Sequence, residues 1–129
     1  MSNVPTTLKY SDNTWVRDDG GGTYTVGITD YAQAQTGSVL TVVDLPTAGT
    51  AVNTGDNCGI IETVTAAVEV RAPISGTITA VNDDMVIADP EFINTDPYGK
   101  GWLLQLTAPD ASGYNALMDA AAYQAATDE

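Results

Sequence analysis

Short runs of strand-forming residues, each ended by glycine, proline or a polar turn, are the feature that most constrains the fold. Polar and apolar residues alternate over residues 23–28, as in a half-buried strand. Residues 39–45 form an apolar run that Pro46 ends. The same texture predicts further strands over residues 58–64, 68–72, 77–82 and 102–106. The sequence therefore predicts a mainly β fold.

Short helices are expected at the edges of this β structure. Thr29 can cap a helix over residues 30–36, and Asp89-Pro90 suits the start of one or two helical turns. The tail from Ala111 to Ala125 carries apolar residues at helical spacing, which predicts one C-terminal helix with an apolar stripe. The stripe comprises Tyr114, Leu117, Met118 and Ala121.

The charge balance is strongly acidic. The formal net charge is −13, and Lys9, Arg17, Arg71 and Lys100 are scattered along the chain. Nucleic-acid binding needs clustered cations, and anionic membrane surfaces need them too, so neither class of partner is expected. The acidity favours solubility over a partner with a basic docking face, although composition does not separate these two interpretations. A length of 129 residues predicts one domain over residues 1–129.

The residues of most enzyme active sites are missing from the sequence. It has no histidine, which removes the usual acid–base group and the commonest metal ligand. Gly20-Gly21-Gly22 lacks the lysine and helix of a phosphate-binding loop and reads as a turn. Asp83-Asp84 is expected to be a solvated turn, and Cys58 a small buried hydrophobe. A non-enzymatic protein without a metal site is therefore expected.

Neither a secretory signal nor a membrane span is expected. The N-terminus lacks a basic and an apolar region, and no apolar run approaches the length of a spanning helix. The lone cysteine excludes an intrachain disulfide and fits a reducing compartment. The expected location is the cytoplasm, either of a bacterium or of a host in which a phage-encoded copy acts.

Residues 59–67 form an apolar hairpin, followed by Arg71-Ala72-Pro73-Ile74-Ser75-Gly76. This pair of segments resembles the lipoyl-attachment hairpin of the glycine cleavage system H protein, in which Glu-Ser-Val-Lys-Ala precedes an Ala-Pro-x-Ser-Gly segment. The resemblance extends over nearly the whole chain. Further blocks that carry it include Trp15-Val16-Arg17, residues 23–29, residues 43–46, residues 80–83, residues 94–99 and Gly101-Trp102-Leu103.

The resemblance implies a lipoyl-domain-like fold and a carrier function. The fold would be a barrel-sandwich hybrid with short flanking helices and a C-terminal helix. In that family a lipoamide arm receives the aminomethyl group when the P protein, glycine decarboxylase, acts on glycine. The arm then visits the T protein and the L protein, and the chemistry belongs to the cofactor.

The chain departs from the family at the attachment position. Glu62-Thr63-Val64-Thr65-Ala66 matches the motif with Thr65 in place of the lipoyl lysine. Lipoate is joined to a lysine amine through an amide, and a threonine hydroxyl is a far poorer nucleophile with a shorter reach. We therefore expect no bound cofactor, although the family carries lipoate. The family also usually has histidines just before the residue matched by Trp15 and at the position of Tyr31, and both are absent here.

These observations favour an H-protein-like module that binds glycine decarboxylase and modulates it without carrying the aminomethyl group. T and L proteins are further candidate partners. The resemblance makes Glu62, Thr63, Val64, Ala66 and Ala67 the candidate docking region around Thr65. Two alternatives stay open: a conventional carrier, lipoylated elsewhere or altered by a lysine-to-threonine change, and a repurposed structural or decoy domain.

Overall fold

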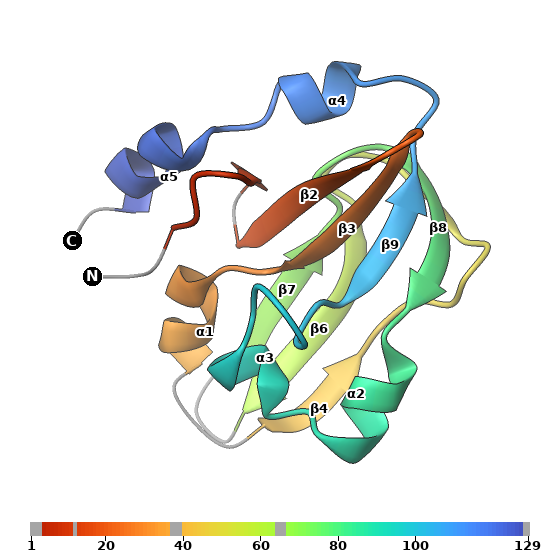
Figure 1. Cartoon of the computed structure of the whole chain (residues 1–129). Helices are drawn as coiled ribbons and strands as arrows, with labels where there is room; N and C mark the ends of the chain where they lie inside the picture. The colour runs from red at the N-terminus through yellow and green to blue at the C-terminus, as the bar shows by residue number, and fades with distance from the viewer. Residues whose placement is uncertain (1–3, 12, 37–39, 64–66, 128–129) are drawn as a thin grey trace.

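The strands of the computed structural model form two antiparallel sheets. The structure describes residues 4–11, 13–36, 40–63 and 67–127. Within these residues the larger sheet has six strands in the order β1-β2-β3-β9-β8-β5, and the smaller has three in the order β4-β6-β7 (Figure 1). The strands are β1 (Lys9–Ser11), β2 (Thr14–Gly20), β3 (Thr23–Ile28), β4 (Leu40–Asp44), β5 (Ala51–Val52), β6 (Asn57–Thr63), β7 (Ala67–Arg71), β8 (Gly76–Val81) and β9 (Leu104–Thr107).

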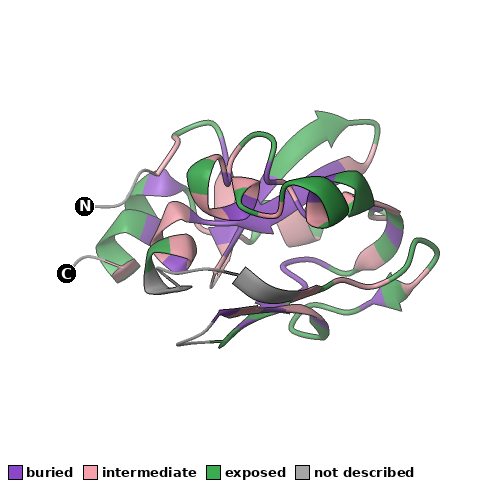
Figure 2. Cartoon of the chain, turned by 90° about the horizontal axis from the view of Figure 1, so that it is seen from below, coloured by how far each residue is buried: buried purple, intermediate pink, exposed green. Residues whose placement is uncertain are grey.

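Short helices lie at the ends and edges of these sheets. In chain order they are α1 (Asp30–Thr36), α2 (Asp83–Ala88), α3 (Phe92–Thr95), α4 (Ser112–Asn115) and α5 (Ala120–Thr127). The two sheets form separate layers, with buried residues concentrated between them (Figure 2). The prediction of a mainly β fold with short flanking helices is therefore confirmed.

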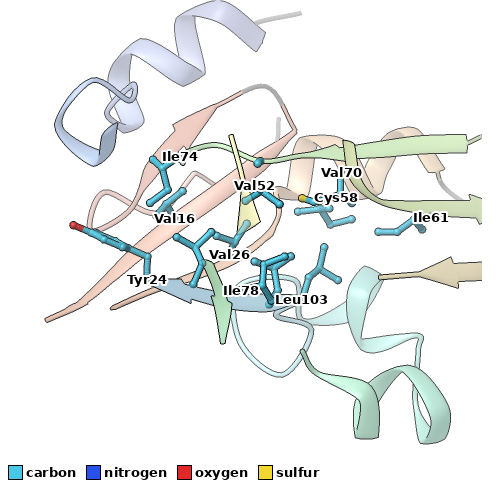
Figure 3. Packing of buried hydrophobic residues seen from close by; sticks show 14 of the residues in the cluster. Val16, Tyr24, Val26, Val52, Cys58, Ile61, Val70, Ile74, Ile78 and Leu103 are labelled. Carbon is cyan, nitrogen blue, oxygen red and sulfur yellow. The ribbon is translucent and has the colours of Figure 1, made fainter. Parts of the chain in front are cut away.

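The main hydrophobic core fills the space between the two sheets. Val16, Val26 and Ile78 come from the larger sheet, and Ile61 and Val70 from the smaller one, each fully shielded from solvent (Figure 3). Buried and exposed residues alternate along β7, as a period of two predicts. Strand β3, for which half-burial was predicted, is instead buried at five consecutive residues, because both of its faces are covered. Cys58 is buried in the same cluster, as predicted.

A second cluster, rich in tyrosine, joins the two ends of the chain. Tyr10 of β1 and Tyr123 of α5 stack with ring centroids 4.8 Å apart. Thr29 and Tyr123 share a hydrogen bond of 2.9 Å between their hydroxyls, and Trp15 donates its indole N–H to the Pro97 carbonyl at 2.9 Å. These polar tips are satisfied inside an apolar cluster, which fixes α5 against the edge of the larger sheet.

The predicted strands and turns match the structure closely. The expected strands over residues 58–64 and 68–72 correspond to β6 and β7 within one residue at each end, and Val64 lies outside the described residues. Gly20 ends β2, and Gly21-Gly22 form the turn to β3, at the predicted place; their φ angles of 89°, 65° and 81° favour glycine. Thr29 caps α1 by accepting a hydrogen bond from the Ala32 N–H at 3.1 Å.

The prediction of one helix over residues 111–125 is wrong. The segment forms α4 and α5, and between them Met118 exchanges two backbone hydrogen bonds with Tyr10, of 2.8 and 3.0 Å. Asp119 then starts α5 by accepting the Ala122 N–H at 2.8 Å. The apolar spacing is genuine, but its residues serve different clusters: Leu117 packs on the main core and Met118 on the tyrosine cluster.

The structure also corrects the region around residues 83–95. Asp83 and Asp84 are exposed, as expected of solvated residues, but they open the helix α2 rather than a turn. Asp89 ends α2, because its N–H donates to the Met85 carbonyl at 2.8 Å, and α3 begins only at Phe92 after Glu91. Asp89 is therefore the C-cap of one helix and not the predicted N-cap of the next.

Candidate functional site

The β6–β7 hairpin places three of the six candidate residues at one end of the smaller sheet. Glu62 lies opposite Ala67 in the β6–β7 pairing, and Thr63 lies opposite Leu40 of β4. Thr65, Val64 and Ala66 belong to the connection between these strands and lie outside the described residues. The structure therefore brings Glu62, Thr63 and Ala67 together at the ends of the two strands that lead into residues 64–66.

The hairpin is anchored in the core immediately before its end. Ile61 is fully buried and pairs with Val68, which is also buried. Glu62 is half-buried, Thr63 is buried and Ala67 is exposed, so the inward and outward faces alternate up to the end of each described strand. Helix α1 contacts β7 and also contacts α3 (Figure 1). The described residues of the candidate region therefore lie on strand ends that are packed against the core.

The titratable groups with shifted pKa values do not suit acid–base work near neutral pH. Burial, with the nearby Asp56 carboxylate, raises the pKa of the Cys58 thiol to about 11. Burial also raises the pKa of Tyr98 to about 12 and that of Tyr10 further still. Each of these groups stays protonated at neutral pH, so Cys58 is not a reactive thiolate.

The part of the chain that the structure describes contains no cluster of three or more histidine, cysteine or acidic residues placed to hold a metal ion. None of the helices in that part is long and apolar enough to cross a membrane.

Comparisons with known proteins decide the family. The family model described as "Glycine cleavage H-protein" matches residues 8–129. The chain belongs to the glycine cleavage H-protein family. It is 48% identical to a glycine cleavage system H protein of Cronobacter sakazakii over 130 residues, covering 100% of this chain and 99% of the relative. It is 51% identical to that of Sodalis glossinidius, covering 100% and 98%.

A solved structure supports the same assignment. A glycine cleavage system H protein from Mycobacterium marinum superposes with a TM-score of 0.85 at 32% identity, covering 98% of this chain and 100% of that one. The predicted lipoyl-domain-like barrel-sandwich fold is confirmed. The prediction of a non-enzymatic protein is confirmed by family membership, because an H protein is a lipoyl carrier and not itself a catalyst.

The lysines of this H-protein family member lie outside the hairpin, and both contact aromatic rings. Lys9 is in β1, with its Nζ 5.5 Å from the centroid of the Tyr114 ring. Lys100 lies in the turn that follows α3, with its Nζ 5.2 Å from the centroid of the Phe92 ring. The sequence contains no other lysine, so the β6–β7 connection offers no side-chain amine for an amide to lipoate.

The two positions where the family resemblance leads us to expect histidine are occupied by residues with structural contacts. Thr14, just before Trp15, is buried and donates its hydroxyl to the Ser11 carbonyl at 2.7 Å. Tyr31 meets Tyr123 edge to face with centroids 6.4 Å apart. These side chains contribute to the packing of the tyrosine cluster and the adjoining turn.

Sequence reasoning missed α2, the tyrosine cluster and the strands β1, β2 and β5, the last of which lies in a segment expected to be a loop. Tyr10, Tyr98 and Tyr123 are far apart in the chain, and only the folded structure shows that they pack together. For α2, Met85 and Val86 were an available signal, because they follow two aspartates at the start of a six-residue apolar and acidic segment.

Proposed function

We propose that this chain is an H-protein-like module that carries no lipoate and that binds and modulates glycine decarboxylase, the P protein. One observation carries the proposal: Thr65 stands where the resemblance places the lipoyl lysine. A hydroxyl gives at most an ester, whereas the family's cofactor is held by an amide. The module would shuttle no aminomethyl group, so its effect on the decarboxylase would come from docking alone.

The remaining amines make poor substitutes for the missing lysine. Lys9 is half-buried in a strand. Lys100 belongs to a turn, and its own backbone N–H donates to Asp96 Oδ2 at 3.0 Å. A ligase that reads the hairpin would therefore find neither lysine in the expected context. Lipoylation at Lys9 or Lys100 is not part of the proposed function.

The docking region would be the end of the β6–β7 hairpin. Glu62, Thr63, Val64, Ala66 and Ala67 flank Thr65, and buried Ile61 and Val68 keep the hairpin in place without a cofactor. A carrier's partners recognise this surface, so P protein is the leading partner, with T and L proteins as further ones. The chain would act in the cytoplasm of a bacterium, or of a host if a phage encodes it.

Binding to purified P protein, followed together with glycine decarboxylation, tests the proposal. We expect a saturable complex and a change in the decarboxylation rate in the presence of a lipoylated carrier, as stimulation or as competition. A parallel titration without the lipoylated carrier separates a direct effect on the decarboxylase from competition. Absence of both a complex and a rate change would refute the proposal.

A charge introduced at the hairpin tests the docking surface. Ala67 is exposed at the start of β7, so Ala67→Arg adds a long cation with little cost to the core. We expect Ala67→Arg to weaken binding to P protein about tenfold or more through steric and electrostatic mismatch. The matched control is Thr77→Arg, at an exposed position of β8 in the other sheet, which should bind like the original chain.

A conventional carrier is the second candidate, favoured by 48–51% identity to H proteins over the full length of the chain. It would be lipoylated at another amine, or the threonine would be a change in a working carrier. A decoy domain unrelated to glycine metabolism is the third candidate. Absence of binding to P protein in the titration would favour it. The mass of the chain after lipoylation separates the first two.

A further inference from the structure

Helix α2 leaves a large apolar side chain in solvent. Ile87 is 82% exposed, and among the residues whose burial is described it is the exposed large hydrophobic residue of the molecule. Its neighbours hold the helix in place, because Met85 is buried and Val86 packs against the main core. Ile87 is therefore presented on an anchored element, and its exposure does not reflect a loose segment.

Exposed acidic residues lie close to this isoleucine in the chain. Asp83, Asp84, Asp89 and Glu91 are all exposed, on α2 or just after it. Within the described residues the ion pairs are Arg17–Asp19 and Arg71–Glu69, while Lys9 and Lys100 lie over aromatic rings. Among the described residues neither ion pair involves these four acids, so the surface combines an apolar side chain with nearby exposed carboxylates.

The charge of the molecule limits what can cover this surface. A second copy of the chain would bring another net charge of −13, and nucleic acids or anionic membranes would be repelled in the same way. A protein surface with an apolar pocket bordered by lysine or arginine side chains would match both the apolar Ile87 side chain and the negative charges near it.

We propose that α2 is a second contact surface for glycine decarboxylase, with Ile87 entering an apolar pocket bordered by cations; this rests on the proposed function. The placement of the helices supports a shared partner. Helices α1, α3 and α2 follow one another along the lower part of the molecule in Figure 1, and α1 contacts both α3 and β7. One partner face can therefore reach the hairpin and α2 together.

Substitution of Ile87 tests the apolar part of this surface. Ile87→Ser should weaken binding to purified P protein about tenfold, the effect of losing a central apolar anchor. Ile87→Leu keeps the apolar volume and should bind within about twofold of the original chain. Since the side chain is exposed, both variants should unfold at the temperature of the original chain, which circular dichroism checks.

The role of the nearby exposed carboxylates is tested by removing two negative charges without changing shape. Asp83→Asn with Asp84→Asn should weaken binding and make it less sensitive to salt. Asp18→Asn with Asp110→Asn removes the same charge near the β2–β3 turn and should have a smaller effect. Unchanged binding by Ile87→Ser would overturn the α2 surface while the proposed function stood. No binding by the original chain would overturn both.

Discussion

Gly27 shows at the scale of one residue how the neighbouring strands β2 and β3 of the larger sheet are fitted together. A Cβ at this position would lie 2.6 Å from the ring of Trp15, well inside any normal contact. Trp15 is fully buried and held by its hydrogen bond to the Pro97 carbonyl, so the ring has no room to withdraw. The sequence shows a glycine inside a strand, and the structure supplies its reason: close packing of an indole against the backbone.

Gly27→Ala is therefore expected to destabilise the protein by about 2 kcal/mol, because the added methyl overpacks a buried contact. Urea denaturation followed by tryptophan fluorescence measures the change in the free energy of unfolding. Thr77→Ala, an exposed strand substitution, is the control and should stay within about 0.5 kcal/mol. Equal stability of Gly27→Ala and the original chain would contradict the packing described here.

Burial of tyrosine predicts a loss of stability in alkali. Burial raises the pKa values of Tyr10 and Tyr98 above the ordinary value of 10. Burial also raises the pKa of the Cys58 thiol. Above about pH 10 the unfolded chain releases these protons while the folded chain retains them, so the free energy of unfolding falls as pH rises. Thermal unfolding between pH 8 and about pH 12 should show this fall. A melting temperature that stays constant across the range would disagree.

At the scale of elements, sequence reasoning found several strands and α1 from local pattern, overlooked the local signal of α2, and failed where long-range contacts decide. Strands β3, β6 and β7 and helix α1 follow from alternation and capping, and Cys58 was correctly placed in the core. The prediction of one helix over residues 111–125 failed because the pairing of Met118 with Tyr10 interrupts the helix. No local sequence pattern indicates that pairing. Within the candidate site, the hairpin was predictable, whereas residues 64–66 are not described.

Asp119 is the residue on which the division into α4 and α5 depends most directly. Asp119→Ala removes the acceptor for the Ala122 N–H and should cost about 1 kcal/mol of stability. Asp119→Asn keeps an acceptor oxygen at the same place and should lose less. Chemical denaturation of the original chain and the two variants measures both losses in the free energy of unfolding. A larger loss for Asp119→Asn than for Asp119→Ala would contradict the capping role of Asp119.

At the scale of the whole molecule, the excess of acidic residues sets the response to salt. With 17 acidic and 4 basic residues the folded chain repels itself, and two of the four cations are already used in ion pairs with Asp19 and Glu69. The same field opposes self-association and draws the molecule toward basic partners. Stability and partner binding should therefore respond to salt in opposite directions.

Raising the salt concentration from about 0.01 M to about 0.1 M shortens the Debye length from about 30 Å to about 10 Å. We expect the melting temperature to rise over this interval, because screening relieves repulsion in the compact state. The variant that combines Asp18→Asn with Asp110→Asn should show a smaller rise. Differential scanning calorimetry measures both, and a melting temperature that falls with added salt would argue against net self-repulsion.

The central claim is that this H-protein family member has no anchor for lipoate. Intact mass after incubation with lipoate ligase and lipoate tests it most directly, with Thr65→Lys as the matched variant. The account predicts no change in the mass of the original chain and the gain of one lipoyl group by Thr65→Lys. A lipoyl increment on the original chain, at any residue, would contradict it.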